Sequence, residues 1–140
     1  MKTIKKDTDL GLLLLRTLVG GLLLLHGFGN LRDGYSFIQG VFAQNGLPEF
    51  LSYGAFFGEI VAPLLLILGV KPRLASGFIV LTMLVVILTS HSGEVFSLNQ
   101  FGGWAIELQA FYLFGALALL FTGAGRYTLL RPLNPSYHVE

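Results

Sequence analysis

Four long apolar segments run along the chain, separated by shorter stretches rich in polar residues, glycine and proline. They cover residues 10–31, 51–69, 74–90 and 104–122. Each is close to the roughly 20 residues that a helix needs to cross the hydrocarbon core of a bilayer. The pattern therefore predicts an all-α fold, a four-helix transmembrane bundle formed by residues 1–140 as a single domain.

The stretches between these segments have patterns of their own. Residues 32–50 hold apolar side chains at mixed helical spacing before the pair Asn45-Gly46, which is typical of a helix end. We expect a short amphipathic helix there, lying at the membrane interface between the first and second spans. Residues 126–140 form a polar tail that we expect to be loosely ordered.

Composition supports a membrane protein. Hydrophobic residues make up 54% of the chain and charged residues only 12%, whereas soluble domains carry about 25% charged residues. The net charge of +1 gives a nucleic-acid partner no electrostatic support. The chain has no cysteine, which excludes disulfides, thiol redox chemistry, cysteine-ligated zinc or iron–sulfur clusters and covalently attached haem.

The basic residues predict an orientation. If the chain crosses four times, seven of them fall on one side and only Arg32 on the other; the seven are Lys2, Lys5, Lys6, Lys71, Arg73, Arg126 and Arg131. Short loops rich in Lys and Arg stay in the cytoplasm, so we expect both termini to be cytoplasmic. The first segment lacks a small-residue cleavage pattern, and we expect a retained helix rather than a signal peptide.

Ionisable side chains at membrane depth are costly and therefore mark candidate functional sites. In the predicted topology, a set of them converges on the outer half of the bundle, with Gln109 slightly deeper: His26, Glu59, His91 and Glu107. Arg16 lies in the inner half. We expect a polar pocket open to the outer face, with Glu59 as the catalytic candidate and Arg16, His26, His91, Glu107 and Gln109 as ligand-binding candidates.

Helical spacing also predicts which faces point inward. Gly54, Gly58 and Ala62 recur every four residues as a small-residue stripe beside Glu59. Arg16, Gly20, Leu23 and Gly27 share a face of the first span, and Glu107, Phe111, Phe114 and Ala118 share a face of the fourth.

Each candidate also has a structural interpretation. Arg16 is long enough to reach the cytoplasmic headgroups, and the histidines suit an interface. Glu107 is placed where the helix dipole favours a carboxylate, and Glu59 could form an ion pair or an interhelical hydrogen bond. Ligation of a metal or haem by His26 and His91 is geometrically possible, but two histidines near helix ends are weak evidence, so we expect no metal and no haem.

Several motifs resemble the DoxX family of small bacterial four-helix membrane proteins. They are "LRTLVGGLLLLHGFGNL", "GLPEFLSYGAFFGEIVAPLLLILGVKPRLASG" and "LTSHSGE", and the resemblance covers about residues 10–125. Arg16, the Gly58-Glu59 pair, Arg73 and His91 match the family pattern. The chain departs from it at Asn30, where the family has a lysine, and this departure weakens any mechanism that needs a cation there.

The resemblance implies a protein of the bacterial cytoplasmic membrane that is linked to redox chemistry. Relatives include a subunit of thiosulfate:quinone oxidoreductase. We therefore expect a redox subunit that binds a quinone or a small sulfur-containing substrate, with Glu59 exchanging protons, a histidine contacting a quinone carbonyl, and a partner redox subunit. Two alternatives stay open. The chain could bind or transport a small molecule or lipid, on its own or as a homo-oligomer, or it could be the scaffold of a membrane complex.

Overall fold

The computed structural model describes residues 2–129. Two helices, α1 (Lys2–Arg32) and α2 (Ser36–Gln44), open the chain. A continuous helical segment follows, made of η1 (Glu49–Leu51), α3 (Ser52–Phe56), the π-helical turn η2 (Phe57–Val61) and α4 (Ala62–Leu68). The chain continues through α5 (Pro72–Ser90), η3 (Ser92–Glu94) and α6 (Glu107–Thr122). Within residues 2–129 there is no strand, only an isolated bridge between Leu98 and Trp104.

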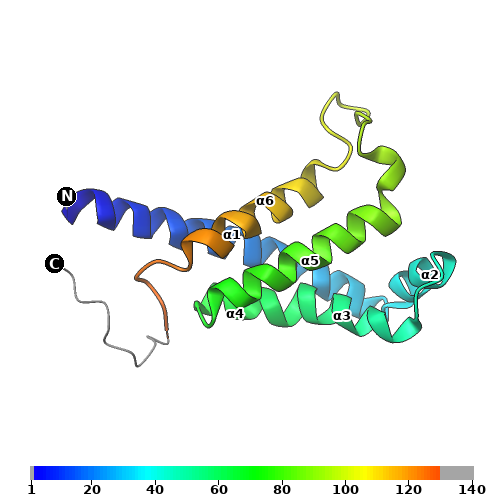
Figure 1. The fold of residues 1–140 in the computed structure, drawn as a ribbon, viewed down its shortest axis with the longest axis horizontal. Helices are drawn as coiled ribbons and strands as arrows, with labels where there is room; N and C mark the ends of the chain where they lie inside the picture. The colour runs from blue at the N-terminus through cyan, green and yellow to red at the C-terminus, as the bar shows by residue number, and fades with distance from the viewer. Residues whose placement is uncertain (1, 130–140) are drawn as a thin grey trace.

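The predicted all-α membrane bundle is confirmed. Among the described residues, three helical segments are long and apolar enough to cross a membrane: Asp7–Arg32, Glu49–Leu68 and Pro72–Ser90. The fourth member, α6, is apolar but has 16 residues. Figure 1 shows α1 running the length of the molecule, with the other long helices packed along it.

The fourth helix begins later than predicted. Trp104 pairs with Leu98 in the loop, and the helix starts at Glu107. The apolar character of residues 104–106 therefore marks a loop rather than a first helical turn. The predicted short helix between the first two spans is confirmed as α2, and Gly46 follows it with a φ of +69°. Of the predicted polar tail, residues 130–140 lie outside the described part.

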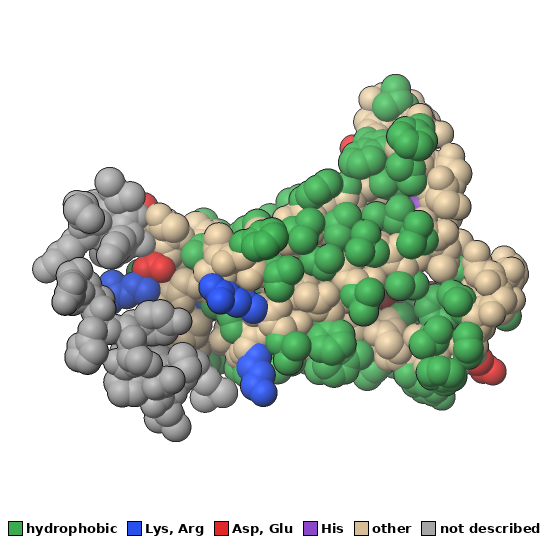
Figure 2. Space-filling model, in the orientation of Figure 1, with side chains coloured by type: hydrophobic (Ala, Val, Ile, Leu, Met, Phe, Trp, Pro, Cys, Tyr) green, Lys and Arg blue, Asp and Glu red, His purple; other side chains and the backbone are tan. Residues whose placement is uncertain are grey.

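The bundle has a buried core and an apolar outer surface. Val19, Leu23, Leu66, Ile79 and Leu119 are fully buried. Large apolar side chains stay exposed along the helices, for example Leu14, Leu25, Leu88 and Phe121. They dominate the face of the bundle seen in Figure 2. In a membrane, such a surface contacts lipid chains.

Glycines let the helices approach closely. An added Cβ at Gly20 would lie 3.0 Å from the carbonyl oxygen of Pro63, and one at Gly58 would overlap Thr82 of α5. The predicted small-residue stripe is thus confirmed at Gly58 and at the fully buried Ala62, but not at Gly54, which faces open space.

The two ends of the bundle differ. We call the end with α2 and the 91–106 loop the loop end, and the end with the α4–α5 turn and residues 123–129 the termini end (Figure 1). At the termini end, the Leu129 backbone N–H donates to the carbonyl oxygen of Leu68 at 3.2 Å.

Candidate functional site

Glu59 lies in a widened helical turn. The π-helical segment η2 covers Phe57–Val61, and Pro63 follows Glu59 by four residues. In an α-helix, the N–H of residue 63 would bond to the carbonyl of Glu59, but proline has no N–H and its ring crowds that carbonyl. The freed carbonyl faces α1 at Gly27, where an added Cβ would lie only 2.5 Å from it. Pro63 and Gly27 together explain why the turn widens here.

The Glu59 side chain is buried and has a neutral partner. Glu59 is 2% exposed, and Asn30 Nδ2 donates a hydrogen bond of 2.7 Å to its Oε2. Asn30 occupies the position at which the sequence motifs lead us to expect a lysine. The group that bonds to Glu59 Oε2 is therefore a neutral amide, which adds no positive charge.

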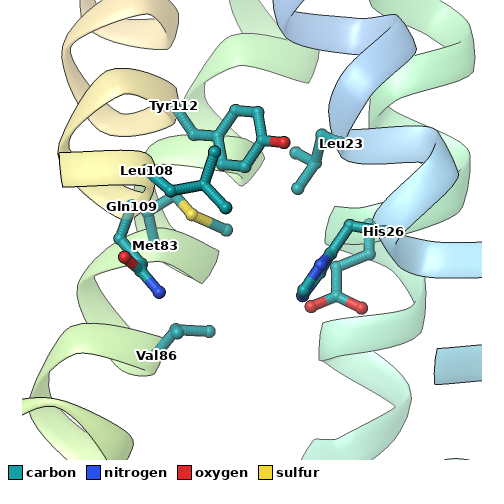
Figure 3. Close-up of a pocket in the computed structure, with 8 residues that line it drawn as sticks. Leu23, His26, Met83, Val86, Leu108, Gln109 and Tyr112 are labelled. Atoms are coloured by element: carbon teal, nitrogen blue, oxygen red, sulfur yellow. The ribbon is translucent and has the colours of Figure 1, made fainter. Parts of the chain in front are cut away.

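A small cavity of about 30 Å³ lies beside Glu59. It lies between α1, η2, α5 and α6, and its lining residues are Leu23, His26, Glu59, Met83, Val86, Leu108, Gln109 and Tyr112. In Figure 3, His26 projects from one side of the cavity toward the side that holds Gln109 and Leu108. A space of this size holds one or two water molecules.

The cavity opens to the surface of the bundle. His26 and Leu108 line it and are both exposed, whereas Leu23, Met83 and Tyr112 are buried. The opening therefore lies between α1 and α6.

His91 does not line the cavity itself but contacts Gln109, which does. Its Nε2 is 3.2 Å from Nε2 of Gln109, and its Nδ1 is 2.8 Å from Oε2 of the exposed Glu94. With Nδ1 donating to the carboxylate, Nε2 accepts from the Gln109 amide. The predicted meeting of His26, Glu59 and Gln109 is thus seen, and His91 contacts this group through Gln109.

Glu107 is placed differently from the prediction. It is exposed, and Asn99 Nδ2 lies 3.5 Å from its Oε1. The expected inward face of the fourth helix was wrong, because Phe111 and Phe114 are 40% and 60% exposed. Another face of the helix packs inward instead, and its buried residues are Ala110, Tyr112, Ala116 and Leu119.

Arg16 lies near the termini end of the bundle, away from the cavity. It is 3% exposed, its Nη1 donates a 2.7 Å hydrogen bond to the carbonyl of Ala124, and its Nη2 donates to the carbonyl of Tyr127. These bonds tie the segment after α6 to α1. The prediction that Arg16 binds a ligand remains a prediction, and the contacts of its guanidinium are with the backbone of this chain.

Three polar residues near Glu59 were not among the predicted site residues. Tyr112 lines the cavity, Asn30 bonds to Glu59, and Tyr35 lies in the following loop. The spacing of His26 and Asn30, four residues apart on one helix, is a signal that could have identified Asn30. In the part of the chain that the structure describes, no three His, Asp or Glu side chains are grouped closely enough to hold a metal ion.

Comparison with known proteins places the chain in a family. The DoxX family model matches residues 11–92, more than half of the chain. A Bacillus subtilis (strain 168) protein named "Putative oxidoreductase CatD" is 28% identical over 127 residues, which cover 91% of this chain and 89% of that protein. No solved structure matches the chain significantly. The family match, the four apolar helices and the Gly58-Glu59 pair on the second of them agree, and the chain belongs to the DoxX family.

Proposed function

We propose that this protein is a redox-linked membrane subunit in which a quinone binds at the Glu59 cavity and Glu59 exchanges a proton with it. The observation that carries the proposal is a buried carboxyl group with a neutral partner, beside a water-sized cavity that opens on the apolar surface. The name of the Bacillus subtilis relative, an oxidoreductase, favours the same class of function.

The size of the cavity limits how a quinone could bind. A volume of about 30 Å³ is too small for a quinone ring, but it accommodates one oxygen atom of the size of a water. We infer that a carbonyl oxygen enters the cavity while the ring stays at the opening, against apolar side chains such as Leu108. A pocket that is mostly apolar with a few convergent polar groups is typical of small-molecule sites.

The side chains at the cavity then have distinct roles. A quinone takes up two electrons and two protons when it is reduced to the quinol. Glu59 holds and releases one proton, Asn30 fixes its Oε2 with the 2.7 Å hydrogen bond, and His26 is placed to contact the ligand oxygen. We assign the supply of electrons to a partner redox subunit.

The proposed setting is the bacterial cytoplasmic membrane with both termini in the cytoplasm. Basic side chains gather toward the termini end (Figure 2), where Arg126 lies 3.9 Å from Asp9 and Arg73 contacts the end of α6. This placement favours a cytoplasmic termini end. The cavity would then lie in the outer half of the membrane. The apolar outer surface would also be available to a partner subunit or to a second copy of the chain.

Titration of the purified protein in lipid nanodiscs with a short-chain ubiquinone tests the proposal. Glu59→Gln keeps the size of the side chain but removes the acid, and we expect about tenfold weaker binding, equivalent to about 1.4 kcal/mol. Glu107→Gln is the matched control, because Glu107 lies outside the cavity. Equal affinity in the wild type and Glu59→Gln would remove Glu59 from the site.

A further inference from the structure

Tyr35 has an unusual backbone conformation. It lies in the loop between α1 and α2 with φ +56° and ψ 7°, the left-handed region that side-chain-bearing residues rarely adopt. Gly34 before it is also left-handed, with φ +74°. The Tyr35 N–H donates a 3.0 Å hydrogen bond to the backbone carbonyl of Asn30. A strained tyrosine at this turn calls for an explanation from its side chain.

The side chain of Tyr35 points into the protein. Its hydroxyl is buried and has no hydrogen-bond partner among the described residues. Its ring packs edge-on against Phe56, with 5.8 Å between the ring centres. Phe56 precedes Glu59 by three residues, about one turn along the same helical segment, so Tyr35 covers the helix on the loop-end side of Glu59.

Asn30 connects the two residues. Its side chain donates to Glu59 Oε2, and its backbone carbonyl accepts from Tyr35. Burial, with a smaller contribution from the charge of Glu59, raises the pKa of Tyr35 to about 12. The phenol therefore keeps its proton across the physiological range and can always donate a hydrogen bond.

We propose that Tyr35 is the proton-relay residue of the Glu59 site, passing protons between Glu59 and the solvent at the loop end through water molecules, one of which bridges its hydroxyl and Glu59. The argument rests on three geometric observations: the buried hydroxyl without a partner among the described residues, the contact of its ring with Phe56 one turn before Glu59, and the contacts of Asn30 with both Tyr35 and Glu59. A buried hydroxyl requires a partner, and a water shared with Glu59 would supply one. The inference depends on the proposed proton exchange at Glu59.

The relay conserves protons and needs no other reactant. When Glu59 is a carboxylate, the bridging water gives it a proton, and the phenol O–H gives its proton to that water. Because the hydroxyl itself is buried, the phenol oxygen takes its new proton from a second water, which receives one from a hydronium ion of the solvent at the loop. The O–H bond of Tyr35 breaks and re-forms in the same event. The phenol is unchanged at the end, Glu59 is neutral, and one proton has left the solvent.

A second polar route exists on the other side of the cavity. There, Glu94, His91 and Gln109 form a hydrogen-bonded series that reaches the cavity wall, and His26 faces Glu59 from α1. An amide such as that of Gln109 passes protons poorly, since both of its amide protons are held firmly. The experiment must nevertheless separate the two routes.

Infrared spectroscopy of the protein in nanodiscs can follow Glu59 directly. The C=O stretching band of a protonated carboxyl group shifts when H₂O is replaced by D₂O, and the band that Glu59→Gln removes identifies Glu59. We expect Tyr35→Phe, which keeps the ring against Phe56, to slow the shift by roughly tenfold or more, as expected on losing a positioned proton-transfer group. Tyr53→Phe is the matched control, because Tyr53 is on the same helical segment as Phe56 and is 71% exposed.

The outcomes distinguish this inference from the proposed function. An unchanged rate in Tyr35→Phe together with a slowed rate in Gln109→Leu would overturn the relay and assign the route to the His91 side. An unchanged rate in both would overturn it as well. If no carboxyl band at any pH depended on Glu59, the proton-exchange role of Glu59 would itself be wrong. Quinone affinity should be unaffected by Tyr35→Phe, since Tyr35 does not line the cavity.

Discussion

Replacing Gly27 with alanine tests the close contact that shapes the Glu59 turn. An added Cβ would lie 2.5 Å from the carbonyl oxygen of Glu59, 2.7 Å from Cδ1 of Ile60 and 2.9 Å from the carbonyl carbon of Glu59. The Ile60 methyl group can rotate away, but the Glu59 carbonyl belongs to a helical turn and cannot. Because carbon atoms normally approach to about 3.5 Å, α1 would have to move away from η2 by up to about 1 Å.

The size of the effect follows from these contacts. Overpacking of this kind costs about 1–3 kcal/mol. The better helix propensity of alanine offsets about 1 kcal/mol of that cost. Moving α1 also stretches the bond from Asn30 to Glu59, and leaving a buried polar group without its partner costs about 1–3 kcal/mol. We therefore expect Gly27→Ala to destabilise the protein by about 1–5 kcal/mol.

The same helix provides a control. Gly29 has no atom within 4 Å of an added Cβ, so Gly29→Ala should be neutral or stabilising by up to about 1 kcal/mol. Thermal unfolding of both variants in the same detergent, followed by circular dichroism, compares them with the wild type. The account of the turn would be refuted if Gly27→Ala unfolded at the same temperature as Gly29→Ala.

Two further predictions concern residues outside the cavity. Arg16→Met should lower the free energy of unfolding by about 3 kcal/mol, because the bonds to Ala124 and Tyr127 are lost; equal denaturant midpoints would contradict the structural role. The absorbance difference between the wild type and Tyr35→Phe should show one phenol titrating near pH 12. Since folding raises this pKa from 10.0, the stability contributed by Tyr35 is present below pH 10 and falls as the pH approaches 12. A midpoint near 10 would count against burial of the hydroxyl.

Hydropathy predicted the helices well because lipid imposes a simple rule on the chain. A spanning segment must satisfy its own backbone hydrogen bonds and present apolar side chains, so long apolar runs become helices. Residues 104–106 broke this rule because an apolar residue can also pack in a loop, as Trp104 does through its bridge to Leu98. The start of α6 therefore could not be predicted from hydropathy alone.

The candidate site was only partly predictable. His26, Glu59 and Gln109 stand out as polar residues in apolar helices, and the structure brings them to one cavity. The inward face of α6 was mispredicted, since helical spacing groups residues on a face but does not say which face meets lipid. Tyr35 could not be found from a pattern, because its importance lies in a left-handed turn and a buried hydroxyl.

The widened turn had a signal in the sequence. Pro63 follows Glu59 by four residues, the spacing at which a missing N–H frees the Glu59 carbonyl. What the sequence could not show is that Gly27 of another helix receives this carbonyl. That contact depends on the relative placement of α1 and η2, which arises only from packing of the whole bundle.

The central claim is that the cavity beside Glu59 is a ligand site. Mass spectrometry of the organic extract from purified wild type, Glu59→Gln and Glu107→Gln tests it most directly. We predict that a quinone is retained by the wild type and by Glu107→Gln and is lost from Glu59→Gln. Extracts that contain only bulk membrane lipids in all three proteins, or the same quinone in equal amounts, would contradict the claim.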